Sequence, residues 1–425
     1  MKILVIGSGG REHALCWAFD QSEKVTKIYC ANGNAGIAEI AECVNIKPDE
    51  IAKLADFAEK NEIDLTFVGG ETTLALGIVD GFEQRGLKII GASRQAAQLE
   101  ASKSFAKDFM ARHDIPTAKY QTAKTAKEAV ETLQSGAFGD ENKSVVVKAD
   151  GLAAGKGVVV AVNRAEAIEA INDLENLVGK AATEKIVLEE CLVGREVSLL
   201  MFADGKNFAL MPPARDHKRI GEGDSGANTG GMGVITDASL LTKEQTGEIV
   251  EKIIKPTLNG AKKEGFEFRG ILFLGLMMTA GGAKVLEYNA RFGDPETQAI
   301  LVRLKTDFVE VCQAILNQTL NNLTIKWKEG SSVCVVLASK NYPNKPQTGD
   351  IITGLDQAKT HQDTNIFHAG TSKKEIGEFI TLGGRVLGVT ANGENLDEAL
   401  QKAYQAVSEI SFEGMQYRRD IGKTH

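Results

Sequence analysis

The chain has 425 residues, of which 43% are hydrophobic and 25% charged, with a net charge of −8. This composition is typical of a soluble globular protein with about three domains of ~150 residues each. The acidic balance argues against a general affinity for nucleic acid, and no apolar run reaches the ~18 residues that span a membrane. The six cysteines and six histidines have no zinc-ligand spacing, and the scattered thiols indicate a reducing, cytoplasmic location.

Strand and helix patterns alternate over residues 1–104. Short apolar runs typical of buried strands occur four times, and stretches with helical periodicity separate them. This order predicts a parallel, doubly wound sheet with right-handed crossovers. Ligands of such sheets bind at the carboxyl ends of the strands. We therefore expect three turns to surround one mouth: residues 7–11, 32–36 and 69–72.

The stretch GSGGREHA, at residues 7–14, is similar to a dinucleotide-binding fingerprint, but Glu12 occupies the position of the third glycine. The free N–H groups of a helix N-terminus attract phosphate, and Arg11 would reinforce them. The stretch therefore favours a sugar phosphate over a nicotinamide cofactor.

Residues 93–114 have the periodicity of one long helix that leads into a second domain. From there to residue 325, short strands mix with helical stretches, and hairpin pairing is expected around residues 150–157 and along residues 185–210. The last strands and the helix at 396–410 indicate a third, smaller unit.

The predicted fold class is therefore α/β and α+β multidomain. It comprises an N-terminal doubly wound parallel sheet (1–104), a central domain of antiparallel sheets with helices (105–325) and a small C-terminal α/β domain (326–425).

The segment VVVKADGLAAGKGVVVA, at residues 145–161, carries two lysines around a glycine-rich loop. It lacks the Gly-Lys-Ser/Thr of a P-loop, because Gly157 follows Lys156. Backbone N–H groups and Lys156 could close as a flap over an anionic ligand, with Gly155 and Gly157 allowing close approach to phosphate. A glycine-rich hairpin with a solvated lysine is the alternative.

The segment KVLEYNARFGDPETQ, at residues 284–298, places Glu287 and Asn289 two residues apart on a predicted strand. Their oxygens share one face and suit magnesium that keeps water and phosphate as its other ligands. Arg291 continues that face and could hold a carboxylate or phosphate. The alternative is an edge strand with solvated polar residues.

Two further segments carry weaker signals. The polar loop at 214–233 offers Asp216 or His217 as a general base, although a histidine in a charged run is commonly solvated. The segment VLEECLVGREVSLL, at residues 187–200, places glutamates at two strand ends, where a carboxylate could accept from ribose hydroxyls. A glutamate-rich surface hairpin is the alternative there.

Five motifs occur in one order: GSGGREHAL, GNAG, KADGLAAGKGV, DHKR with NTGGMG, and RFGDPETQ. With them the chain resembles the ATP-grasp ligases and, among these, the phosphoribosylamine–glycine ligase family. The resemblance runs through essentially the whole chain. It implies ATP-dependent ligation of glycine to 5-phosphoribosylamine in de novo purine synthesis, giving glycinamide ribonucleotide, ADP and phosphate through glycyl phosphate.

The resemblance also implies site residues, which are expected to contact ATP, Mg²⁺ or Mn²⁺, and the two small-molecule substrates. The ATP contacts are Lys107, Lys148, Gly155, Lys156, Gly157, Glu189, Glu190, Leu192 and Glu196, and the metal ligands are Glu287 and Asn289. The catalytic residues are Lys148, Asp216 and Arg291, and the substrate contacts are Gly9, Gly10, Arg11, Asn228 and Asp294. A monomer without nucleic-acid or membrane partners is expected.

The stretch GGETTL, at residues 69–74, departs from the family pattern at Gly70, Thr72 and Thr73, as does ASKNYPNKP further on. These departures affect the details of ribose-phosphate binding and of the C-terminal loop. Two rival interpretations are another ATP-grasp ligase and a nucleotide-sensing scaffold protein on the same fold.

Overall fold

The computed structural model describes residues 1–153, 157–375 and 377–423. The sequence predictions for Gly155 and Lys156 lie outside these ranges. Among the described residues, no helix is long and apolar enough to cross a membrane.

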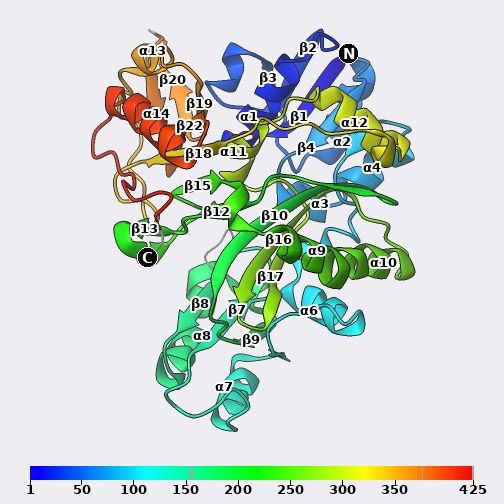
Figure 1. The fold of residues 1–425 in the computed structure, drawn as a ribbon, viewed down its shortest axis with the longest axis vertical. Helices are drawn as coiled ribbons and strands as arrows, with labels where there is room; N and C mark the ends of the chain where they lie inside the picture. The colour runs from blue at the N-terminus through cyan, green and yellow to red at the C-terminus, as the bar shows by residue number, and fades with distance from the viewer. Residues whose placement is uncertain (154–156, 376, 424–425) are drawn as a thin grey trace.

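The N-terminal part is a five-stranded parallel sheet in the order β3-β2-β1-β4-β5, as predicted (Figure 1). Its strands are β1 (Lys2–Gly7), β2 (Lys27–Asn32), β3 (Glu42–Val44), β4 (Leu65–Val68) and β5 (Ile89–Ile90). Its helices are α1 (Gly10–Asp20), α2 (Ile51–Lys60), α3 (Glu71–Ala75) and α4 (Ile78–Gln84). The strand order reverses between β1 and β4, so the turns after these two strands flank a topological switch point, where such sheets bind ligands.

The predicted long helix at 93–114 is wrong. The structure has two helices, α5 (Gln98–Ala101) and α6 (Lys103–Arg112), separated by Ser102 in an extended conformation. The Ser102 hydroxyl accepts a hydrogen bond from the Phe105 N–H at 3.1 Å and donates to the Asp150 carboxylate at 3.1 Å. This N-cap and the distant carboxylate favour a new helix start over continuation.

A four-stranded antiparallel sheet, in the order β6-β9-β7-β8, forms the lower lobe in Figure 1. Its strands are β6 (Tyr120–Ala123), β7 (Val145–Ala149), β8 (Val158–Ala161) and β9 (Ile186–Glu190), with α7 (Ala126–Gln134) and α8 (Arg164–Val178) packed on them. Strands β7 and β8 pair antiparallel from Val145↔Ala161 to Lys148↔Val158, which confirms the predicted hairpin.

A nine-stranded sheet forms the centre of the molecule, in the order β17-β16-β10-β12-β15-β18-β22-β19, with β11 paired to β10. Its strands are β10 (Arg195–Asp204), β11 (Phe208–Leu210), β12 (Ala214–Asp216), β15 (Gly233–Thr236), β16 (Arg269–Thr279), β17 (Gly282–Asn289), β18 (Ser331–Ala338), β19 (Thr364–His368) and β22 (Arg385–Gly393). The antiparallel pairing of β15 with β18, at Val234↔Cys334, continues this sheet into the C-terminal part of the chain. The division at residues 104 and 325 stays a prediction.

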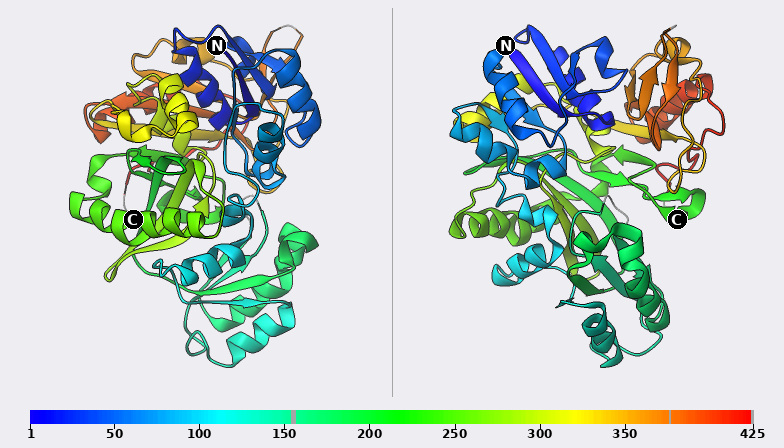
Figure 2. Two further views of the ribbon diagram at one scale, coloured as in Figure 1. Left: turned by 90° about the vertical axis from the view of Figure 1, so that its right-hand side faces the viewer. Right: turned by 180° about the vertical axis from the view of Figure 1, so that it is seen from behind.

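The remaining elements flank these sheets in the two further views of Figure 2. Two ribbons are β13 (Arg219–Gly221) with β14 (Ser225–Asn228) and β20 (Thr371–Lys373) with β21 (Phe379–Thr381). The helices are α9 (Lys243–Ile249), continued by a π turn (Val250–Ile254) into α10 (Lys255–Lys263), then α11 (Glu296–Leu301), α12 (Phe308–Asn317), α13 (Leu355–Ala358) and α14 (Leu396–Glu409). Short 3-10 turns are Ile37–Glu39, Lys180–Thr183, Glu222–Asp224, Ala238–Leu240 and Leu320–Asn322.

The hairpin predicted along residues 185–210 is correct only for β10 and β11, which pair at Met201↔Leu210. Strand β9 belongs to the small sheet and β10 to the large one, so residues 191–194 cross between two sheets. At Gly194, a Cβ atom would lie 2.2 Å from the Met278 carbonyl oxygen, so the crossing requires a residue without a side chain. This crossing opens a cleft between the two sheets.

The C-terminal segment is fastened to the β13–β14 ribbon by Arg418, which is 0% exposed. Its guanidinium donates to both carboxylate oxygens of Asp420, at 2.8 and 2.7 Å, and to Asp224 at 2.7 Å. A second connection runs through His217, whose Nε2 accepts from the Gly422 N–H at 3.1 Å.

We expect Arg418→Met to lower the free energy of unfolding by about 3 kcal/mol, because it removes a buried guanidinium that bonds to carboxylates on two segments of the chain. Urea denaturation measures this change. The matched control is Arg419→Met, whose exposed side chain lies one residue away, and its unfolding midpoint should match the wild type. Equal midpoints for both variants would contradict this role of Arg418.

Candidate active site

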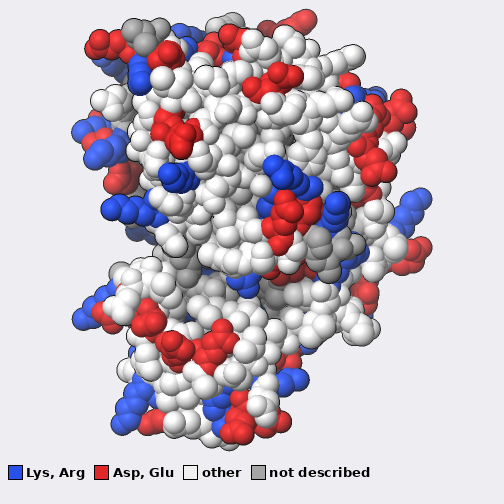
Figure 3. All heavy atoms as spheres, turned by 90° about the vertical axis from the view of Figure 1, so that its left-hand side faces the viewer, with Lys and Arg blue, Asp and Glu red and all other residues white. Residues whose placement is uncertain are grey.

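A cavity of about 320 Å³ lies between the small sheet, the large sheet and the N-terminal part of the chain. Figure 3 shows the hollow between the upper body and the lower lobe. The cavity volume is in the range of small-molecule sites, ~300–1,000 Å³. Ten of the sequence-predicted site residues line it: Arg11, Lys107, Lys148, Gly157, Glu189, Asp216, Glu287, Asn289, Arg291 and Asp294.

Two lysines in the cavity share one carboxylate. Lys107 from α6 and Lys148 from β7 each place Nζ 2.8 Å from an oxygen of Glu189 on β9, and all three side chains are buried. The contact between Lys107 and Glu189 is also a hydrogen bond, whereas the contact between Lys148 and Glu189 lacks hydrogen-bond geometry. Lys148 donates instead to the Leu286 carbonyl at 3.3 Å. Two cations beside one anion leave a positive excess, which suits a phosphate group.

Burial lowers the pKa of Lys107 to about 8. The Glu189 carboxylate opposes this shift, and the neighbouring charge of Lys148 adds to it. Lys107 therefore loses its charge at a much lower pH than an exposed lysine does.

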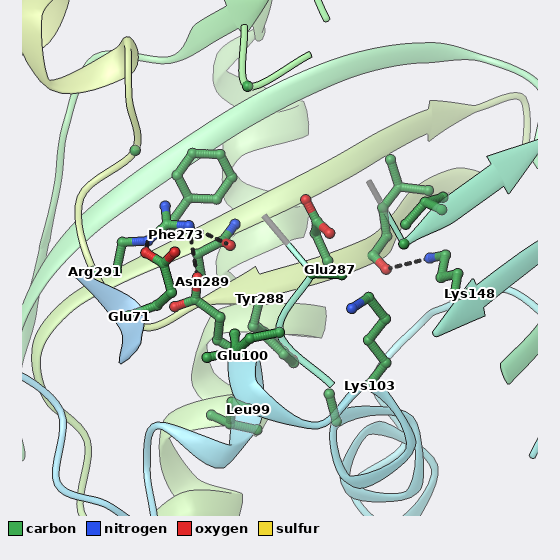
Figure 4. Close-up of a pocket in the computed structure, with 18 of the residues that line it drawn as sticks. Glu71, Leu99, Glu100, Lys103, Lys148, Phe273, Glu287, Tyr288, Asn289 and Arg291 are labelled. Carbon is green, nitrogen blue, oxygen red and sulfur yellow. Dashed lines mark hydrogen bonds and ion pairs between the residues drawn. The ribbon is translucent and has the colours of Figure 1, made fainter. Parts of the chain in front are cut away.

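Glu287 and Asn289 lie two residues apart on β17, and their side chains point into the cavity (Figure 4). Burial raises the pKa of Glu287, but the charges of Lys218, Lys148 and Lys103 outweigh it, so the net shift is downward. Within the described part of the chain, the Glu287 carboxylate accepts no hydrogen bond and forms no ion pair.

A free, ionised carboxylate beside an amide oxygen fits a hard divalent cation that takes its other ligands from water and phosphate. No group of three or more His, Cys, Asp or Glu side chains in the described ranges is arranged to hold a metal ion. An ion at Glu287 and Asn289 would take further ligands from water and phosphate.

Arg291 is held by carboxylates from two helices. Its Nε lies 3.2 Å from Glu71 at the start of α3, and its Nη2 lies 2.7 Å from Glu100 on α5. Its Nη2 also donates to Asn289 Oδ1 at 3.3 Å, as drawn in Figure 4. Burial raises the pKa of Glu71, yet the charges of Arg291 and Arg11 lower it to about 2. Glu71 stays ionised and fixes the orientation of the guanidinium.

Asp216, at the end of β12, lies on the cavity wall with Lys218 Nζ 3.4 Å from its Oδ2. His217 is neither solvated nor in the cavity: it is buried, and its Nδ1–H donates to the Gly233 carbonyl at 3.3 Å. Burial, followed by the charges of Arg215 and Arg418, lowers the pKa of His217 to about 4. The ring is a neutral structural link to the C-terminal segment, which excludes it as the general base.

Six predicted site residues do not line the cavity. Gly9 and Gly10, before and at the start of α1, lie against the side chains of Asp294 and Gln298. Glu190 pairs with Lys284 at 3.1 Å, and Glu196 lies 3.6 Å from Lys218. Leu192 lies in the crossing between the sheets, and Asn228 pairs with Arg219 in the β13–β14 ribbon. Their roles stay predictions.

Sequence reasoning assigned no role to several charged residues that line the cavity: Glu71, Glu100, Lys103, Lys218, Glu296 and Arg385. Three of these residues could have been identified from the sequence. Lys103 lies one helical turn before Lys107, whereas Lys218 and Glu296 belong to motifs that were recognised. Arg385 could not, because its place in the cavity follows from the pairing of β22 with β18.

Comparisons with known proteins agree with this architecture. Family models of phosphoribosylglycinamide synthetase match three parts of the chain: the N domain over residues 1–100, the ATP-grasp (A) domain over 101–297 and the C domain over 332–424. A phosphoribosylamine–glycine ligase of Caldanaerobacter subterraneus is 48% identical over 422 residues, which cover 99% of both chains.

Two crystal structures have a similar fold. The phosphoribosylamine–glycine ligase of Thermotoga maritima is 33% identical, with a TM-score of 0.84 over 99% of this chain and 100% of that one. A biotin carboxylase domain from Hydrogenobacter thermophilus, solved with MgADP and bicarbonate, is 17% identical, with a TM-score of 0.73 over 98% of this chain and 91% of that one. This second likeness concerns the fold alone. From the family models and the relatives at 33–48% identity, the chain belongs to the phosphoribosylamine–glycine ligase family and contains its ATP-grasp domain.

Proposed function

We propose that the cavity binds ATP with Mg²⁺ or Mn²⁺ and ligates glycine to 5-phosphoribosylamine in purine (IMP) biosynthesis. The products are glycinamide ribonucleotide, ADP and phosphate, and glycyl phosphate is the intermediate. The observation that carries this proposal is the convergence of Lys107, Lys148, Glu287 and Asn289, which come from α6, β7 and β17, on one cavity. The chain is an enzyme of the carbon–nitrogen ligase class, as its family membership states.

The nucleotide occupies the positive side of the cavity. Lys107 and Lys148 contact the phosphates of the nucleotide. These contacts replace part of the pairing of the two lysines with Glu189. The connection between β7 and β8 serves as the phosphate flap, since Ala153 and Gly157 on its two sides line the cavity. Glu190, Leu192 and Glu196, near the crossing between the sheets, are assigned to the adenosine end.

Glu287 and Asn289 hold the divalent ion, which neutralises phosphate charge when it is bound. Arg291, fixed by Glu71 and Glu100, supplies a second, preorganised positive charge for the transferred phosphoryl group. Phosphoryl transfer demands mainly positioning and charge neutralisation from the protein.

The reaction has two steps. A glycine carboxylate oxygen bonds to the γ-phosphorus while the bond to the ADP oxygen breaks. The phosphoribosylamine nitrogen then attacks the acyl carbon, phosphate leaves with the electron pair, and the nitrogen gives up a proton. Substrates that fill the cavity displace water from it, which limits hydrolysis of the acyl phosphate between these steps.

The substrate phosphate lies at the turn after β1. Gly9 and Gly10 bring the backbone of the α1 N-terminus close to it, and Arg11 adds a positive charge. The Asp294 carboxylate accepts a hydrogen bond from the Arg11 backbone N–H at 3.3 Å. This bond joins the turn after β1 to the segment that follows β17, where we place the contact between the two substrates. Asn228 completes the substrate contacts. The acidic net charge and the free thiols support a cytoplasmic monomer that acts on small molecules.

A coupled assay tests the function. ADP release should require both glycine and freshly made phosphoribosylamine, and replacing phosphoribosylamine by hydroxylamine should give glycyl hydroxamate. ADP release that ignores glycine, or no hydroxamate in a reaction that turns over, would contradict the proposal.

Glu287→Ala should reduce ligation roughly 100-fold or more, since it removes an anionic ligand from a charge-stabilising site. The measurement is ADP release at saturating Mg²⁺. Glu248→Ala is the matched control, because the half-buried Glu248 lies beside the start of β17, outside the cavity. Wild-type turnover by the Glu287 variant would refute its assignment as a metal ligand.

ATP affinity should fall as the pH rises through about 8, because Lys107 loses its charge there and a neutral amine no longer attracts phosphate. Calorimetric titration from about pH 7 to about pH 9.5 measures the dissociation constant. Lys107→Arg keeps the charge throughout this range and should flatten the profile. If both proteins show the same profile, Lys107 does not contact the nucleotide phosphates.

A further inference from the structure

Two acidic side chains share one wall of the cavity, and the proposed reaction has not used them together. Asp216 ends β12 and Glu296 begins α11, with exposed fractions of 7% for the Asp216 side chain and 4% for Glu296. Gly231 allows the two elements to meet: a Cβ atom there would lie 2.7 Å from Asp216 Oδ1 and 2.7 Å from Pro295 Cδ. The two carboxyl groups thus come from chain segments about 80 residues apart.

This wall contains unused hydrogen-bond acceptors. Within the described residues, Asp216 Oδ1 is buried without a hydrogen-bond partner, and the adjacent His217 N–H donates instead to the Gly233 carbonyl at 2.9 Å. Glu296 Oε1 has only a long hydrogen bond, 3.4 Å, from the Ser198 hydroxyl. A buried carboxylate oxygen without a partner is costly, so these oxygens favour a ligand that brings N–H donors.

The cations that face this wall are already paired. Lys218 Nζ lies 3.4 Å from Asp216 and 3.6 Å from Glu196, so two carboxylates share one ammonium. Arg291 is held by Glu71 and Glu100. Arg385 lies 3.6 Å from Asp294 and donates to the carbonyls of Gly230 and Asp294. These three cations are therefore already engaged, and the other carboxylate of this region, Glu287, is faced by Lys218, Lys148 and Lys103.

The pKa values of both carboxyl groups are shifted upward. Burial, followed by the charge of Asp216, raises the pKa of Glu296 to about 7, against the opposing charges of Lys218 and Arg291. Burial also raises the pKa of Asp216. At neutral pH the empty pair therefore holds a proton for part of the time, and a cation that binds there would displace it.

We propose that Asp216 and Glu296 form the ammonium subsite for glycine and so select an amino acid over other small carboxylic acids. This subsite rests on the proposed function. In glycine a single carbon separates the ammonium from the carboxylate, so its site must lie in the cavity that holds the phosphoryl-transfer groups, and Asp216 and Glu296 line that cavity. The alternative role for the pair, accepting the proton from the attacking amine, would leave glycine binding unchanged.

The test is calorimetric titration of glycine into the full chain with Mg²⁺ and ADP, in buffers of different ionisation enthalpy. Wild type should release a fraction of a proton per glycine at pH 7, and less at higher pH where Glu296 is already ionised. Glycolate and acetate, which lack the ammonium, should bind much more weakly. This measurement needs no variant, so it decides the proposal even if a substitution at Glu296 disturbs folding.

Glu296→Gln should raise the glycine dissociation constant by about tenfold or more, because it replaces a charged hydrogen bond, and should abolish the proton release. Glu296→Asp should restore part of both. Glu244→Gln is the matched control, since Glu244 lies in the first turn of α9 as Glu296 does in α11, but at an exposed position.

Wild type that binds glycine without proton release would overturn the subsite, and so would a folded Glu296→Gln variant whose glycine affinity is within about twofold of wild type. The hydroxamate assay separates this failure from that of the proposed function. If glycyl hydroxamate forms but the calorimetric results are negative, only the subsite is wrong. If no hydroxamate forms, the ligase proposal itself fails.

Discussion

The Glu189 carboxylate, buried between the ammonium groups of Lys107 and Lys148, is the interaction on which the cleft depends. It ties α6, which follows the N-terminal sheet, to two strands of the small sheet. Removing one partner of a buried ion pair costs ~3–5 kcal/mol, so all three groups have to be present together for any of them to be buried. The same constraint recurs at Arg291, where Glu71 and Glu100 tie β17 to helices of the N-terminal half. The charged groups that hold the parts of the chain together are also the groups that face the cavity.

This arrangement prepares the cavity for an anion. Because their carboxylate partners are fixed, Lys107, Lys148 and Arg291 are oriented before a ligand arrives, and little reorganisation is needed when phosphate charge is brought in. A nucleotide therefore competes with Glu189 for the two lysines. In contrast, Glu287 accepts no hydrogen bond and forms no ion pair within the described residues, and the wall of Asp216 and Glu296 has carboxylate oxygens with few hydrogen-bond donors. In the proposed function, the phosphates, the metal ion and the glycine ammonium bind at these three different regions of the cavity.

The C-terminal part of the chain contributes to this cavity through the large sheet. Pairing of β15 with β18 extends the central sheet, and β22 then brings Arg385 to Gly230 and Asp294. Arg418 and His217 fasten the last residues to the ribbon that follows Asp216. The C-terminal part of the chain therefore reaches the site directly through Arg385 and indirectly through the position of this ribbon.

The sequence by itself determined the features that depend on neighbouring residues. Strand alternation was enough to place Glu287 and Asn289 on one face, and the apolar runs with intervening helical periodicity were enough to predict the parallel sheet. Ordered motifs, each read from a few adjacent residues, were enough to indicate the family that the comparisons show.

Only the tertiary structure decided features that depend on residues far apart in the chain. The helix predicted over 93–114 breaks at Ser102 because Asp150 accepts hydrogen bonds there. Strands β9 and β10 enter different sheets because each has a better partner elsewhere, and His217 is buried because the C-terminal segment closes over it. The pairing of Glu189 and the raised pKa of Glu296 likewise arise from contacts across the fold. Local sequence specifies backbone conformation, whereas burial and electrostatics are set by whichever distant groups the packed chain brings together.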